Sequence, residues 1–97
     1  MIFAKLNYKG HYSEMHEQVV ACLQKDFKNI EEGLQGDSWI WVINQNKKVA
    51  VDTFTAMQHE VKCEEKDSLL VGQVIEVLKK EFDVEIYDQP DLEAHEE

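Results

Sequence analysis

Residues 36–54 constrain the fold most, because they predict two adjacent β-strands that are apolar on both faces. The first run, 36–43, reads Gly-Asp-Ser-Trp-Ile-Trp-Val-Ile, and the second, 48–54, reads Lys-Val-Ala-Val-Asp-Thr-Phe. Side chains alternate between the two faces of a strand, and one apolar face is enough to bury a core under helices. The second apolar face must therefore be covered by another layer of the chain, by a second copy of it or by a ligand.

Alternation along these strands assigns side chains to faces once the turns are set. We expect a two-residue turn at 45–46, because Asn tolerates the left-handed backbone angles that such turns need. One face, named the valine face, then holds mostly aliphatic residues and one histidine from the next predicted strand: Ile40, Val42, Val49, Val51, His59 and Val61. The other face, named the aromatic face, holds Trp39, Trp41, Ile43 and Phe54 among charged side chains. The valine face is the better candidate for a core under helices.

The rest of the chain predicts two amphipathic helices and three further strands. Helices are expected at 13–28 and from a cap at 67 or 68 to 82, where apolar residues recur every three or four positions. Strands are expected at 2–8, 58–63 and 84–87, and 29–36 is expected to be a short packed connection with turns at Gly33 and Gly36. The order β-α-β-β-β-α-β predicts an α+β two-layer sandwich. It has a mostly antiparallel sheet of about five strands with two helices on one face, related in shape to the ferredoxin-like plait.

The C-terminal end differs in composition from the rest of the chain. Residues 83–97 contain seven acidic residues and no lysine, and Pro90 interrupts the last predicted strand pattern. We therefore expect residues 1–89 to form a single α+β domain and residues 90–97 to form an acidic, flexible tail.

Composition argues against several classes of function. The chain has a net charge of −10 and no arginine, whereas nucleic-acid and anionic-membrane binding require a basic surface. No apolar run approaches the length of a membrane span, and no signal-peptide pattern precedes the first strand. Two cysteines, Cys22 and Cys63, fall in no metal-binding spacing. We expect a cytoplasmic protein with no cofactor, no metal, no direct nucleic-acid partner and no membrane partner.

The candidates for chemistry are few. Asp52, Thr53 and His59 lie on two neighbouring predicted strands, and a one-residue change in the turn between them would place Asp52 opposite His59. A carboxylate that orients an imidazole is half of many general-base sites, but no nucleophile accompanies this pair. His11 and His16, five residues apart at a helix start, are interpreted as solvated surface histidines. We assign no catalytic residue, and the sequence favours a protein that is not an enzyme.

These observations favour a small acidic protein that acts by binding. The preferred prediction is a non-enzymatic protein-interaction or self-association module, a homodimer or a complex with another protein, that uses Trp39, Trp41, Ile43 and Phe54. An alternative is a small-molecule-binding or minor enzymatic domain centred on Asp52, Thr53 and His59. A weaker alternative is an acidic decoy that occupies a basic, nucleic-acid-binding partner.

Overall fold

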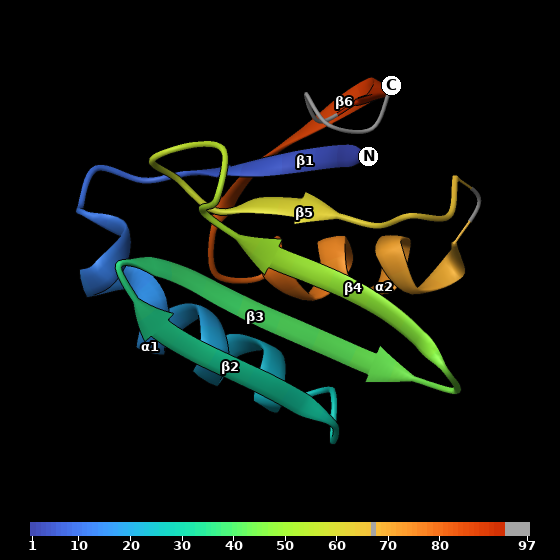
Figure 1. Cartoon of the computed structure of the whole chain (residues 1–97), viewed down its shortest axis with the longest axis horizontal. Helices are drawn as coiled ribbons and strands as arrows, with labels where there is room; N and C mark the ends of the chain where they lie inside the picture. The colour runs from blue at the N-terminus through green and yellow to red at the C-terminus, as the bar shows by residue number, and fades with distance from the viewer. Residues whose placement is uncertain (67, 93–97) are drawn as a thin grey trace.

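Six antiparallel strands form one sheet, and two helices pack against it (Figure 1). The structure is a computed structural model that describes residues 1–66 and 68–92. In chain order the elements are β1 (Ile2–Asn7), α1 (Tyr12–Gln24), β2 (Ile30–Gln35), β3 (Asp37–Asn44), β4 (Lys47–Asp52), β5 (Glu60–Lys62), α2 (Leu69–Leu78) and β6 (Asp83–Asp91). The prediction of an α+β sandwich with a mostly antiparallel sheet is confirmed.

The strand order in the sheet is β2-β3-β4-β5-β1-β6. Strands β2 to β5 follow one another as a meander, and β1 lies between β5 and β6. This insertion brings the N-terminus next to the middle of the chain: the backbone N–H of Leu6 donates to the carbonyl of His59 (2.8 Å), and that of Cys63 donates to the carbonyl of Met1 (3.0 Å). Residues that follow β1 therefore lie beside residues that precede β5.

Both helices pack on the valine face, and the core lies between them and the sheet. In Figure 1 α1 lies behind β2 and β3, and α2 lies behind β4 and β5. Helix α1 contributes a buried stripe at helical spacing, which consists of His16, Val19, Val20 and Leu23. Helix α2 is more apolar, and its buried residues are Leu70, Val71, Val74, Ile75, Val77 and Leu78. Neither helix of the described residues is long and apolar enough to cross a membrane.

The hairpin of β3 and β4 has the predicted turn and register. Gln45 and Asn46 both have positive φ angles (51° and 65°), as a two-residue type I′ turn requires. Val42 pairs with Val49, and Ile40 pairs with Val51. All four side chains are fully buried against the helices. The assignment of the valine face to the core is therefore confirmed.

The segment expected to be a packed connection is instead a sixth strand. β2 pairs with β3 along its whole length, and Gly33 lies opposite Trp39. A Cβ atom at Gly33 would come within 2.6 Å of the Trp39 indole, so glycine here makes room for the ring in a strand. Only Gly36, with φ of +82°, has the backbone of a turn glycine. The prediction of a turn at Gly33 was wrong, because a glycine can mark either a turn or a strand position beside a large side chain.

The last strand is longer than expected. β6 runs through Pro90 to Asp91, which pairs with Ile2. Proline is compatible with an edge strand, since the N–H that it lacks is not needed by a second neighbour. The predicted start of the tail at residue 90 is therefore too early, because residues 90 and 91 belong to β6. Residues 93–97 of the predicted tail lie outside the described residues.

Candidate functional site

The aromatic face is the side of the sheet that the two helices leave uncovered. Trp39, Trp41 and Ile43 alternate along β3 on this side, and each is half-buried. The two indole rings lie 4.7 Å apart between centroids, and Lys48 Nζ lies 4.3 Å from the centroid of the Trp41 ring. Phe54, in the loop after β4, is 53% exposed. Its ring lies 5.9 Å from Lys62 Nζ, so the structure brings Phe54 to the same side.

A buried group of charges lies beside the tryptophans on this face. The Lys62 ammonium contacts the Asp52 carboxylate at 2.6 Å and the Glu60 carboxylate at 3.8 Å. It also donates to Thr55 Oγ1 (3.0 Å), which donates to Glu60 Oε1 (2.6 Å). Asp52, Glu60 and Lys62 are all less than a tenth exposed although no helix covers them. Their mutual pairing offsets the cost of removing each charge from water.

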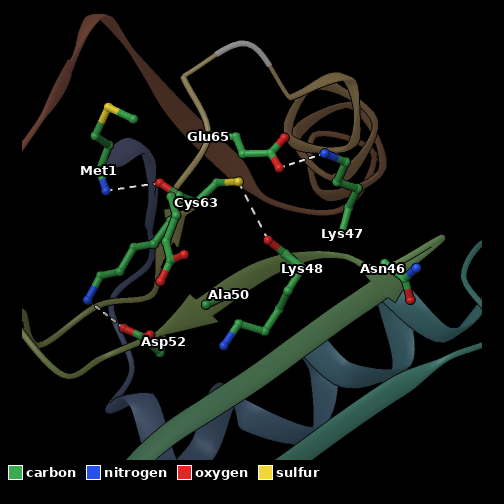
Figure 2. A pocket seen from close by; sticks show the side chains of 10 residues that line it. Met1, Asn46, Lys47, Lys48, Ala50, Asp52, Cys63 and Glu65 are labelled. Carbon is green, nitrogen blue, oxygen red and sulfur yellow. Dashed lines mark hydrogen bonds and ion pairs between the residues drawn. The ribbon is translucent and has the colours of Figure 1, made fainter.

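A shallow hollow of about 270 Å³ opens over Ala50, between Lys48 and Asp52 on β4 (Figure 2). Its far end is closed by an ion pair between Lys47 and Glu65 (2.6 Å). Small-molecule sites usually enclose roughly 300–1,000 Å³ and are mostly apolar. This hollow is small and polar, and several of the charges that line it are already paired with one another.

The structure separates Asp52 from His59. Asp52 faces the aromatic side and pairs with Glu60 in the register of β4 and β5. His59, one residue earlier than Glu60, faces the opposite side and contacts Ser38 and Tyr8. Thr53 belongs with His59 rather than with Asp52, because its hydroxyl accepts from the backbone N–H of Ser38 (3.0 Å). The three residues of the predicted ligand site therefore do not share one surface.

His59 is instead part of a chain of polar side chains whose central members, His59, Ser38 and His16, are buried in the core on the helix side of the sheet. The members of this histidine relay are Tyr8, His59, Ser38, His16 and Glu32. Ser38 Oγ lies 2.7 Å from His59 Nε2 and 2.5 Å from His16 Nδ1. At the two ends, Tyr8 Oη lies 2.7 Å from His59 Nδ1, and Glu32 Oε1 lies 2.7 Å from His16 Nε2.

Burial controls the chemistry of the relay. Ser38 and His59 are fully buried, and His16 is nearly so. Desolvation, followed by the neighbouring His16, lowers the pKa of His59 to about 4. Desolvation also raises the pKa of Tyr8 from its usual value, against the opposing effect of a hydrogen bond from the His59 backbone N–H (3.1 Å). The burial of Ser38 keeps substrates away from its hydroxyl, so the relay is not the nucleophilic site that a serine between histidines suggests.

The relay was missed from the sequence because His16 was interpreted as a surface residue, which is wrong. A signal was available: His16, Val19, Val20 and Leu23 recur at i, i+3, i+4 and i+7, so His16 belongs to the buried stripe of α1. Ser38 likewise lies two and four positions before Ile40 and Val42 in β3, so its side chain points to the same face of the sheet. Two polar residues on two core-facing stripes predict a mutual hydrogen bond.

Comparison with known proteins finds no family model that matches this chain, no similar curated protein and no similar solved structure. The inferred function therefore rests on the residues described above.

Proposed function

We propose that this protein is a non-enzymatic interaction module that self-associates through its aromatic face. The observation that carries the proposal is a row of half-exposed tryptophans on the one sheet face that neither helix covers. Aromatic side chains contribute most of the energy in many protein interfaces, because they bury large apolar areas. The tryptophans and Phe54 lie on this surface together with the buried ion pair of Asp52 and Lys62.

The charge distribution favours a second copy as the occupant. On the aromatic face Lys62 is neutralised by Asp52 and Glu60, Lys5 lies 3.8 Å from Glu85, and Lys48 lies over an indole ring. The two outer strands carry further acids. Glu31 of β2 lies opposite Trp41 and shares the aromatic side, whereas Glu32 lies opposite Ile40 on the helix side. The acids of β6 are Asp83, Glu85, Asp88 and Asp91. Acidic edges oppose edge-to-edge pairing of two copies of a chain with a net charge of −10. A second copy would meet the least repulsion at the centre of the aromatic face, where Lys62 is paired with Asp52 and Glu60.

A dimer interface of standard size would use nearly the whole of this face. The molecule measures 31 × 28 × 24 Å, and Figure 1, viewed down the shortest axis, shows the sheet broadside. The product of the two longer extents limits the face to about 870 Å², close to the ~800 Å² per partner of a standard interface. Face-to-face packing of two such sheets would give four layers, with helices on the outside and both aromatic faces in the centre.

Solution mass tests this proposal. Sedimentation equilibrium of the full chain should give a concentration-dependent mass that rises from 11.3 kDa towards twice that value. Trp41→Ser should weaken the dimer about tenfold or more, because it removes a central aromatic contact. Leu69→Ser is the matched control, since Leu69 is 86% exposed on α2 and lies away from the aromatic face.

Either of two results would overturn the proposal. One is a monomer at every concentration up to about 1 mM, where even a weak dimer would be populated. The other is a dimer that Leu69→Ser weakens as much as Trp41→Ser does. Circular dichroism and urea unfolding of both variants show whether each remains folded.

The two alternatives from the sequence are less favoured. A ligand site centred on Asp52, Thr53 and His59 would have to form from residues on opposite faces of the sheet. An acidic decoy remains a prediction, and it would use the acids of β6 instead of the aromatic face. In that case Trp41→Ser would leave capture of a basic partner unchanged.

A further inference from the structure

The two ends of the histidine relay determine which atoms in it donate. An ionised Glu32 can only accept, so His16 donates from Nε2–H and keeps a lone pair on Nδ1. The Ser38 hydroxyl then donates to His16 Nδ1 and accepts from His59 Nε2–H. His59 Nδ1 is left to accept from the Tyr8 hydroxyl. With both imidazoles neutral, every hydrogen bond therefore runs in one direction, from Tyr8 to Glu32.

The same atoms accommodate one more proton if the direction between the histidines reverses. A proton from hydronium in the solvent then resides on His16, which becomes an imidazolium beside the Glu32 carboxylate. His16 Nδ1–H donates to Ser38 Oγ, the Ser38 O–H donates to His59 Nε2, and His59, still neutral, carries its proton on Nδ1 and donates to Tyr8 Oη. The same four contacts serve both arrangements, and one proton has been added in total.

We propose that the histidine relay is a two-state proton switch, which stores one proton at His16 and reports it at Tyr8 by reversing its hydrogen bonds. In the first state the Tyr8 O–H is used within the relay. In the second state Tyr8 Oη accepts from His59, so its own proton is available for another acceptor. Tyr8 also lines a separate hollow of about 460 Å³ with residues that follow β1 and precede β5. The relay thus connects the protonation of His16 to the hydrogen bonding of a residue that lines that hollow.

A second proton cannot be stored in the same way. With two imidazolium ions Ser38 Oγ would face two N–H donors, and its own O–H would have no acceptor in the relay. The lowered pKa of His59 agrees with this, because burial and the nearby His16 both oppose a second charge. The titratable groups that contact the two imidazoles are Tyr8 and Glu32. Helix α2 presents only apolar side chains to the core, and Glu60 faces the other side of the sheet.

The relay lies on the valine face, so this inference does not depend on self-association through the aromatic face. It is tested by imidazole nitrogen NMR on the full chain, titrated from pH 8 downwards. At pH 8 both His16 and His59 should carry their proton on Nε2. As His16 titrates, His59 should change to the Nδ1–H tautomer while it remains neutral. A His59 that keeps its Nε2 proton throughout, or that becomes charged together with His16, would overturn the proposal.

Two carboxylate variants provide a matched comparison without disturbing the core. Glu32→Gln removes the anion beside His16 Nε2, at a side chain that is 43% exposed. It should lower the pH at which the His59 tautomer changes, because it removes the carboxylate that accepts from His16 Nε2–H. Glu31→Gln alters the neighbouring exposed acid of β2 and should move that midpoint much less. Equal shifts in the two variants would show that Glu32 does not anchor the relay, and the proposal would fail.

Discussion

Acidification should destabilise this protein through His59, by an amount that follows from the burial of that residue. The native state lowers the pKa of His59 from 6.5 to about 4, whereas the unfolded chain keeps the ordinary value. The native state therefore prefers the neutral imidazole, and the contribution of His59 to stability is fully present above pH 6.5. As the pH falls, the unfolded chain binds the proton first, and stability is lost until the native His59 also becomes protonated near pH 4.

The magnitude is set by the size of that pKa difference. Each unit corresponds to about 1.4 kcal/mol, so His59 should remove about 2 kcal/mol of unfolding free energy by pH 5 and about 3 kcal/mol by pH 4. This loss is a large part of the roughly 5–15 kcal/mol that stabilises a typical domain. Little further change from this group is expected below pH 4, since both states are then protonated.

Urea unfolding at pH steps between 7.5 and 4 measures this loss. Carboxylates also titrate in that range, so the informative quantity is the difference between the wild type and His59→Gln, which carries no titrating group at that position. Its stability should fall less steeply with decreasing pH.

Parallel curves for the wild type and His59→Gln would refute the reasoning. If His59→Gln does not fold, the two imidazole nitrogens of His59 in the wild type can be followed by NMR, which distinguishes a charged ring from a change of tautomer. An imidazolium at His59 with a midpoint near 6.5 would then show that burial does not govern this group.

Three further substitutions test the packing. Gly33→Ala should destabilise the chain by about 1–3 kcal/mol, because the new Cβ forces the Trp39 indole to move; an unchanged tryptophan emission spectrum would contradict this. Gly72→Ala should raise the free energy of unfolding by about 0.5–1 kcal/mol, since a Cβ there meets no atom within 4 Å on an exposed helix position; thermal melting would detect a change of the opposite sign. Lys62→Met should cost about 3–5 kcal/mol by leaving Asp52 buried without its cation, and urea unfolding that shows a cost below about 1 kcal/mol would mean that the pair is solvated.

The contrast between β2 and β3 shows how far sequence reasoning reaches. β3 and β4 alternate strictly, and the asparagine-containing turn sets their register, so both faces of the hairpin were predicted. β2 has a weak pattern, and its glycine resembles a turn. It is a strand because its backbone pairs with β3 along its whole length, and its glycine leaves space for the Trp39 indole of that neighbouring strand.

The candidate sites divide in the same way. Alternation and helical spacing are properties of neighbours in the chain, so the sequence by itself determined that this protein has more apolar sheet surface than two helices cover. The histidine relay depends on contacts between distant residues: Tyr8 meets His59 only because β1 lies beside β5, and His16 meets Ser38 only because α1 packs on β3. Tertiary structure decided these pairings, since a buried polar group takes whichever partner the packed elements bring within hydrogen-bonding distance.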